Sequence, residues 1–259
     1  MRILLTNDDG IHAPGLWALH AALAPGNEVT IVAPDRERTG VGHAITLHHP
    51  LRTALLAVNG TEGYAVNGTP ADCVKLAILE ILGGRPDLVV SGLNPGANVG
   101  VNLHYSGTVA AAREAALGGI PAIAASIDGR APRDVASPAR FVRRLADRIA
   151  AHGLRPGTFL NVNFPDVGWE ATAGVRVSRQ GLSVFREYVE KRLDPRNRPY
   201  YWQGADVQRF DEDPPDVDGS ALRSGFVSVT PIRCDMTDYD GLERLKGWEL
   251  DLNGGEGGA

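Results

Sequence analysis

The chain lacks the usual signs of a disulfide-rich, metal-cluster or membrane protein. Its two cysteines, Cys73 and Cys234, have no CxxC spacing, which argues against a disulfide framework or a zinc cluster. No apolar stretch reaches about 18 residues, so a membrane span is not expected. The N-terminus has only a short apolar run before two acids, unlike a signal peptide. We therefore expect a cytoplasmic protein with no membrane partner.

An excess of positive charge and the usual nucleotide-binding fingerprints are also missing. The formal net charge of -5 provides no basic field for a polyanion, so a nucleic acid polymer is not an expected partner. A small anion is not excluded, because local dipoles and a bound cation can override the global charge. Neither GxGxxG nor GxxxxGK[ST] spacing is present, which leaves dinucleotide and ATP sites without support.

The first two thirds of the chain alternate between apolar runs and helical patterns. Such alternation, with each strand continuously apolar, is typical of an α/β fold with a parallel sheet covered on both faces. The expected strands are Arg2–Thr6, Glu28–Ala33, Asp87–Ser91, Pro121–Ser126 and Thr158–Phe164. The expected helices are Pro14–Ala24, Thr69–Leu82, Thr108–Leu117 and Ala139–His152.

The alternation weakens from about Arg176 onward. Residues 187–219 carry many charges and prolines and one aromatic group, and they predict either an extended arm or a partly mobile excursion. A segment this irregular is usually functional or used in assembly. After it we expect a strand over Gly225–Ile232, a short helix over Tyr239–Gly247 and a frayed glycine-rich end.

Two polar clusters follow the first two predicted strands. Residues 6–10 (TNDDG) offer two adjacent carboxylates beside a glycine turn, which suit a single cation. Residues 35–40 (DRERTG) add the Thr39 hydroxyl, which can reach the same crevice. Each cluster alone is more often a solvated polar turn or a charged surface loop. The ends of strands in an open parallel sheet, however, are where ligands bind.

Two further clusters lie later in the sequence. Residues 91–100 (SGLNPGANVG) allow close backbone approach and supply two asparagine amides, although such a loop is also a common connector. Residues 105–108 (YSGT) open a helix, where free amides and two hydroxyls form an anion site or a plain N-cap. Because these loops should converge, and Asp, Thr and Asn oxygens suit Mg²⁺ or Mn²⁺, a metal site with an adjacent anion site is predicted.

At these motifs the chain resembles the SurE (survival protein E) family of nucleotidases. The matching segments are ILLTNDDGIHAPG, VAPDRERTG, GTPADC, VVSGLNPGANVG and YSGTVAAAREA, which together are specific and cover about the first half of the chain. The resemblance implies a Rossmann-like α/β core and divalent-metal-dependent hydrolysis of nucleoside 5′-monophosphates. In some members it also implies hydrolysis of 3′-monophosphates and short polyphosphate.

The resemblance also implies a C-terminal extension that exchanges between subunits of a homodimer or homotetramer. We accordingly expect a Rossmann-like catalytic core over residues 1–180. Residues 181–259 are expected to form an extension with a swapping arm, a strand and a short helix that closes back on the core.

Carried over position by position, the resemblance assigns roles to eight residues. It implies one divalent ion per subunit, Mg²⁺ or Mn²⁺, held by Asp8, Asp9, Thr39 and Asn94, and a phosphate held by Asn98, Ser106, Gly107 and Thr108. The family usually has serine where this chain has Thr39, so the hydroxyl is kept and a methyl is added.

The expected reaction is metal-assisted hydrolysis with Asp8 and Asp9 as catalytic residues. Asp8 is favoured as the group that orients or deprotonates the attacking water. A covalent aspartyl-phosphate is the rival mechanism, but it usually comes with a DxD arrangement, whereas these acids are adjacent. Two other classes stay open: a non-catalytic nucleotide-binding or sensing protein, and an assembly protein whose arm matters more than its pocket.

Overall fold

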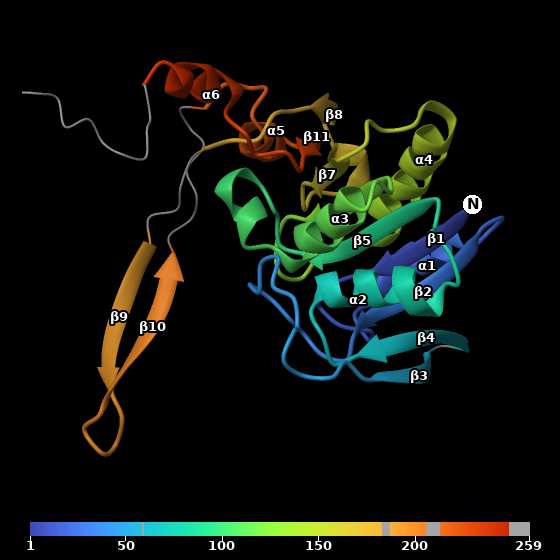
Figure 1. The fold of residues 1–259 in the computed structure, drawn as a ribbon, viewed down its shortest axis with the longest axis horizontal. Helices are drawn as coiled ribbons and strands as arrows, with labels where there is room; N and C mark the ends of the chain where they lie inside the picture. The colour runs from blue at the N-terminus through green and yellow to red at the C-terminus, as the bar shows by residue number, and fades with distance from the viewer. Residues whose placement is uncertain (59, 183–186, 206–212, 249–259) are drawn as a thin grey trace, which may run out of the picture.

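The computed structural model describes residues 1–58, 60–182, 187–205 and 213–248. Within them, nine strands form one sheet in the order β3-β4-β2-β1-β5-β6-β7-β11-β8. Neighbouring strands are parallel from β4 through to β7. Only β3 with β4 and β11 with β7 pair in antiparallel fashion, while β8 lies parallel to β11 at the far edge. The predicted α/β fold with a mostly parallel sheet is confirmed (Figure 1).

The elements have the following bounds. The strands of the large sheet are β1 (Arg2–Thr6), β2 (Glu28–Pro34), β3 (Thr53–Val58), β4 (Thr61–Val66), β5 (Leu88–Pro95), β6 (Ala122–Ile127), β7 (Thr158–Phe164), β8 (Gly174–Val177) and β11 (Phe226–Arg233). The helices are α1 (Pro14–Leu23), α2 (Pro70–Leu76), α3 (Gly107–Leu117), α4 (Ala136–His152), α5 (Asp218–Arg223) and α6 (Tyr239–Lys246). Shorter turns are η1 (Ala77–Ile81), η2 (Gly100–His104) and η3 (Trp169–Ala171).

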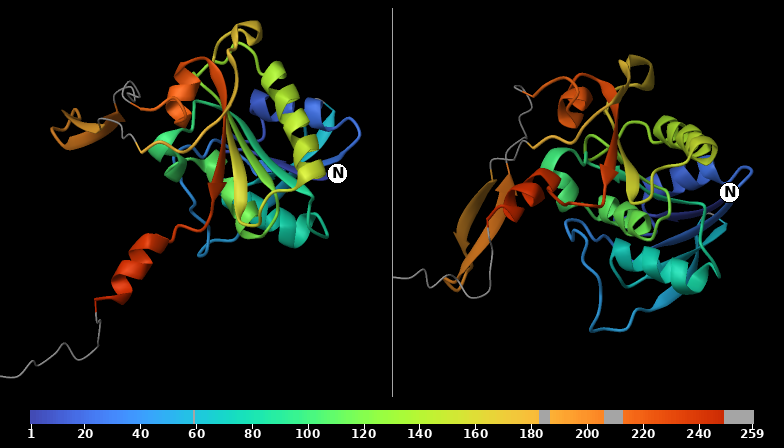
Figure 2. Two further views of the ribbon diagram at one scale, coloured as in Figure 1. Left: turned by 90° about the horizontal axis from the view of Figure 1, so that it is seen from above. Right: turned by 45° about the horizontal axis from the view of Figure 1, so that its top comes forward.

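Two helical layers cover the two faces of the sheet. Successive side chains of a strand point to opposite faces, so Ile3 and Leu5 pack in one core and Leu4 packs in the other. The first core is closed by α1 and α4, whose apolar residues it contains, and the second by α2 and α3. The two views of Figure 2 show the sheet between these layers. Both faces of each central strand are thereby buried, which explains their continuous apolar sequences.

The structure differs from the sequence-based expectation at several elements. Strands β3 and β4 were not expected and extend the sheet beyond β2. The helix expected over Thr69–Leu82 is α2 followed by a π-helical turn, η1. Thr69 caps it with a reciprocal capping box to Asp72, as its sequence indicates. Strand β5 runs on from the expected end at Ser91 to Pro95, with a register shift on β6 between Ser91 and Asn94.

The C-terminal part of the chain returns to the sheet. Strand β11 lies between β7 and β8, close to the expected bounds, and α6 takes the place of the expected short helix. Much of the expected arm is a hairpin of β9 (Glu187–Leu193) and β10 (Pro199–Ala205), which projects from the body in Figure 1. Residues 206–212 of that arm, and the glycine-rich end from 249, lie outside the described residues. The role of the arm in assembly and the division of the chain at residue 180 stay predictions.

Asp218 links the base of this C-terminal segment to the middle of the chain. Its buried carboxylate accepts hydrogen bonds from the backbone amides of Gly100, Gly181 and Gly219 at 2.8–3.0 Å. Burial raises the pKa of Asp218, and the three amide bonds oppose that shift.

Among the described residues, no helix is both long and apolar enough to cross a membrane.

Candidate active site

A polar pocket lies where the carboxyl ends of the parallel strands meet. From β1 the chain adds β2 on one side and later β5 on the other, so the strand order reverses at β1. Such a reversal opens a crevice outside the strand ends, which is the usual ligand site of an open α/β sheet. The pocket has a volume of about 740 Å³. Six of the eight residues assigned from the sequence line it: Asp8, Asp9, Thr39, Asn94, Asn98 and Ser106.

A tight turn after β1 presents the two aspartates. The Asn7 side chain closes this turn, since its amide donates to the Gly10 carbonyl at 2.9 Å and its carbonyl accepts from the Gly10 amide at 3.2 Å. Gly10 has φ of +97°, a conformation that favours glycine. The Arg38 amide donates to the Asp8 carbonyl at 2.7 Å, which joins this turn to the loop after β2. The TNDDG sequence is therefore a structured turn and not a solvated acidic pair.

Helix α3 fixes the position of the Asp8 side chain. Asp8 is only 4% exposed, and the buried Thr108 hydroxyl donates a hydrogen bond to its Oδ1. A Cβ added to Gly107 would lie 2.8 Å from the Asp8 Cβ and 2.9 Å from its Oδ2, so the contact requires glycine. Gly107 and Thr108 were assigned to phosphate from the sequence. Their side-chain positions contact Asp8, and a phosphate role for their backbone amides stays a prediction.

The carboxylate of Asp9 has an unfavourable environment for its charge. Its Oδ2 is buried and has no hydrogen-bond partner among the described residues. Burial, followed by the charges of Asp8 and Glu37, raises the pKa of Asp9 to about 7. Burial also raises the pKa of Asp8, although the Thr108 hydroxyl opposes this. Two carboxylates in this state favour a cation between them, because a buried and unpaired anionic oxygen is costly.

Asn94 and Thr39 present further oxygens to the pocket. The Asn94 amide nitrogen donates to the Gly96 carbonyl at 2.6 Å, which leaves its carbonyl oxygen for another partner. The Thr39 hydroxyl donates to Glu37 Oε1 at 2.6 Å, so its lone pairs are available as well. Asn94 comes from the end of β5 and Thr39 from the loop after β2, as the strand-end argument predicts.

The expected anion side of the pocket is built around Asn98 and the start of α3. The Asn98 backbone amide donates to Asn163 Oδ1 at 2.8 Å, and its side-chain amide donates to Ser126 Oγ at 2.9 Å. Its carbonyl accepts from the side-chain amide of Asn161 at 2.8 Å. Ser106 is the N-cap of α3, where its hydroxyl accepts from the Val109 amide at 3.1 Å. Further amides of that first helical turn remain for a ligand, because the first four N–H groups of a helix have no intrahelical acceptor.

Among the pocket residues that received no role from the sequence, four have polar or charged side chains: Glu37, Asn102, Tyr105 and Arg130. Arg130 lies just after β6, and the strand-end rule that selected the earlier loops would have found it. Tyr105 and Glu37 stand inside motifs that were examined, but a single sequence does not show which way their side chains point. Arg130 brings a positive charge to a pocket that otherwise carries three carboxylates, Asp8, Asp9 and Glu37.

The donor set fits a hard divalent cation. Two carboxylates, an amide oxygen and a hydroxyl are the oxygen ligands that Mg²⁺ and Mn²⁺ prefer, with water completing the shell. No group of three or more His, Cys, Asp and Glu side chains placed to bind a metal occurs in the described part of the chain, which is unlike a zinc site. Fold and site together define a Rossmann-like α/β protein with a polar pocket at the carboxyl edge of its sheet.

Comparison with known proteins gives the family. The protein-family model described as "Survival protein SurE" matches residues 3–187. The "5'-nucleotidase SurE" of Desulfatibacillum aliphaticivorans is 58% identical over 252 residues, 97% of this chain and 99% of that protein. The protein of the same name from Syntrophobacter fumaroxidans is 49% identical over 251 residues, 96% and 100% of the two chains. The crystal structure of the SurE protein from Aquifex aeolicus aligns with a TM-score of 0.84 at 38% identity, covering 96% of this chain and 100% of that one. The chain belongs to the SurE family.

The raised pKa of Asp9 predicts a pH window for cation binding. The folded, metal-free protein holds a proton on Asp9 up to about pH 7, whereas the unfolded chain releases it near 3.8. Because the pKa is higher in the folded state, protonation of Asp9 stabilises the folded protein. This stabilisation is fully present below pH 3.8 and is lost as the pH rises through about 7. A cation must displace the proton, so its affinity should rise up to about pH 7 and then level off.

Melting curves with and without saturating Mn²⁺ test this expectation. The increase in Tm caused by Mn²⁺ should be larger at pH 8 than at pH 5.5. An equal increase at both pH values would contradict the assignment of Asp9 as a ligand.

Proposed function

We propose that this protein is a 5′-nucleotidase that hydrolyses nucleoside 5′-monophosphates to a nucleoside and phosphate with the help of a divalent metal. The observation that carries the proposal is the buried oxygen of Asp9, which has no partner in the described part of the chain. It lies beside Asp8 and Asn94 in a pocket that also receives the N-terminus of α3. The family membership and the names of the relatives support the same reaction.

The metal ligands in this proposal are Asp8, Asp9, Thr39 and Asn94, which hold one Mg²⁺ or Mn²⁺ per subunit. When bound, such a cation neutralises charge on the phosphoryl group and lowers the pKa of a water molecule. The short contact with Thr108 holds Asp8 in one orientation, which suits a group that accepts a proton from the attacking water. The water oxygen bonds to phosphorus as the bond from phosphorus to the ribose oxygen breaks. The electron pair of that bond leaves with the ribose oxygen, which takes a proton to become the 5′-hydroxyl, and the proton that Asp8 accepts balances this uptake.

The remaining phosphate oxygens are bound by the chain itself. Ser106, the amides of Gly107 and Thr108, and the Asn98 side chain supply donors, and the dipole of α3 favours an anion at this end. Arg130 adds a cation to this side of the pocket. Fixed donors of this kind stabilise charge that spreads over the phosphoryl oxygens in the transition state.

The hairpin of β9 and β10 supports a homodimer or homotetramer as the working form. It pairs only with itself among the described strands. Its exposed side chains include Tyr188, Val189, Leu193, Tyr201 and Trp202. An apolar, aromatic surface on a projecting element is typical of a protein interface.

Release of phosphate from AMP and GMP tests the proposal. We expect turnover in Mn²⁺ or Mg²⁺ and its loss in EDTA, with restoration when the metal is returned. A panel that adds 3′-monophosphates, short polyphosphate and an aryl phosphate defines the substrate range. A protein that shows nucleotide-dependent melting but no phosphate release would instead be a nucleotide-binding or sensing protein.

A further inference from the structure

The loop that carries Thr39 has no regular structure of its own. Between the end of β2 at Pro34 and the start of β3 at Thr53, the chain forms neither a helix nor a strand. The Thr39 hydroxyl bonds to Glu37 in the same loop, so this bond does not fix the loop to the body of the protein. On one side of Thr39 the Arg38 amide donates to the Asp8 carbonyl at 2.7 Å, and contacts on the other side determine how the rest of the loop is held.

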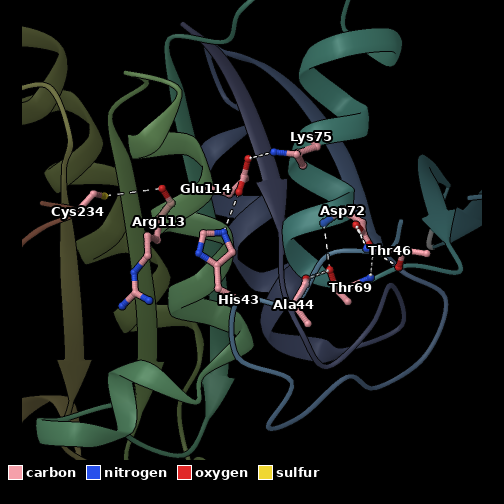
Figure 3. Close-up of polar contacts among 9 residues, drawn as sticks. All are labelled: His43, Ala44, Thr46, Thr69, Asp72, Lys75, Arg113, Glu114 and Cys234. Carbon is pink, nitrogen blue, oxygen red and sulfur yellow. Dashed lines mark hydrogen bonds and ion pairs between the residues drawn. The ribbon is translucent and has the colours of Figure 1, made fainter. Parts of the chain in front are cut away.

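The loop is tied to α3 just beyond Thr39. The Gly42 amide donates to the Tyr105 carbonyl at 2.9 Å, immediately before the N-cap of α3. His43 Nε2 donates to Glu114 Oε2 at 2.8 Å, two turns further along the same helix. Figure 3 shows the His43 ring and the Glu114 carboxylate pointing toward each other. Helix α3 therefore holds both the loop and, through Gly107 and Thr108, the side chain of Asp8.

A second tie joins the loop to α2. The Asp72 carboxylate accepts from the Thr46 amide at 2.9 Å and from the Thr46 hydroxyl at 2.6 Å, as Figure 3 shows. The Thr69 hydroxyl donates to the Ala44 carbonyl at 2.8 Å. Both residues of the α2 cap thus hold the loop at residues 44–46, on the far side of His43 from Thr39.

Glu114 is the branch point of this network. Its side chain is 13% exposed, and it binds His43 through one oxygen and Lys75 Nζ, at 2.6 Å, through the other. The hydrogen bond from His43 is the largest cause that holds the pKa of Glu114 below its usual value. A charge-assisted bond to a mostly buried carboxylate is stronger than a neutral bond at the surface. Of the two partners, only His43 belongs to the loop, because Lys75 lies in α2.

We infer that His43 and Glu114 form a positioning pair that places Thr39 at the metal site and thereby sets the affinity for the cation. Neither residue lines the pocket, so the pair acts through the loop and not on the substrate. This inference rests on the proposed metal-dependent function. It adds to that function a role for two residues that lie outside the site.

Direct binding of Mn²⁺ to EDTA-treated and dialysed protein tests the pair, measured by calorimetry. His43→Ala should weaken Mn²⁺ binding by about tenfold, at the lower end of what loss of an outer-shell partner causes. Lys75→Ala is the matched control, because it removes the other partner of Glu114 and leaves the loop contact intact. It should bind Mn²⁺ within about twofold of the parent protein, as expected for a half-exposed ion pair.

A conservative change and an exchange measurement complete the test. His43→Gln keeps a donor near Glu114 and should recover most of the Mn²⁺ affinity. Hydrogen exchange should show faster exchange of the Gly42 amide in His43→Ala but not in Lys75→Ala. If His43→Ala does not fold, His43→Phe, which fills the space of the ring without a donor to Glu114, replaces it and should weaken Mn²⁺ binding by about tenfold relative to Lys75→Ala.

The outcomes separate this inference from the proposed function. Equal Mn²⁺ affinity in the His43→Ala and Lys75→Ala proteins would overturn the positioning role and leave the nucleotidase proposal standing. A parent protein that binds no Mn²⁺ and releases no phosphate would overturn both.

Discussion

Replacing Asp9 by asparagine is expected to reduce phosphate release from AMP by about 10³-fold, comparable to the loss of a major electrostatic group in an active site. The substitution keeps the shape of the side chain and removes the charge that a cation requires. The same variant should melt at a higher temperature than the parent protein in EDTA at pH 8. At that pH the parent must bury a charged carboxylate whose pKa is raised to about 7 and whose Oδ2 has no hydrogen-bond partner among the residues that the structure describes.

Opposite effects on activity and on metal-free stability distinguish a ligand from a residue that merely supports the fold. Asp35→Asn provides the control, because Asp35 is an exposed acid at the start of the next loop and lies outside the pocket. Its activity should stay near that of the parent. An Asp9→Asn protein with parental activity, or one that melts at a lower temperature in EDTA, would count against the site.

Replacing Gly107 by alanine is expected to reduce kcat by about 10²-fold through a displacement of Asp8, since small errors in position cost this much in catalysis. The added methyl group would lie 2.8 Å from the Asp8 Cβ and 2.9 Å from its Oδ2, so the aspartate must move. Alanine suits the first position of a helix, and the cost in stability should stay at about 1–3 kcal/mol from crowding alone.

Gly118→Ala, at the C-terminal end of the same helix, is the matched control. Gly118 has a negative φ, and its added Cβ would meet only the last turn of α3. Steady-state kinetics and melting curves of the two variants are compared side by side. A Gly107→Ala protein with a parental kcat would show that Asp8 does not need its present position.

Much of the central fold follows from the sequence because its signals are local. Strands β1 and β7 have the expected bounds, since polar Asn7 follows the first and Pro165 follows the second. Helix α1 begins at a proline, as expected, and α3 begins within one residue of the expected start. Strands β3 and β4 were missed although Asn59-Gly60 between them is a strong hairpin signal. Their residues are partly exposed, so they lack the continuous apolar character that marked the inner strands.

The sequence predicted which loops line the pocket but not which side chains contact one another there. The rule that parallel strands end at one edge gathers Asp8, Thr39 and Asn94 around one pocket, as the sequence indicated. The bond of Thr108 to Asp8 spans 100 positions in the chain, and no periodicity reports it. The sequence also did not predict that β11 runs antiparallel to β7, because an apolar run fits a parallel or an antiparallel neighbour equally well.

One side of the pocket depends on a residue far along the chain, because the carboxylate of Asp218 holds Gly100. Gly100 stands two residues after Asn98 and opens the turn that leads to Tyr105 and Ser106. Asp218, which is 118 positions further along the chain, thus stabilises this side of the pocket. A shortened protein that retains α5 and β11 keeps this contact, whereas one that stops after β7 leaves the Gly100 amide without its acceptor. The hairpin can be trimmed with far less damage to this side of the pocket than the short helix that follows it.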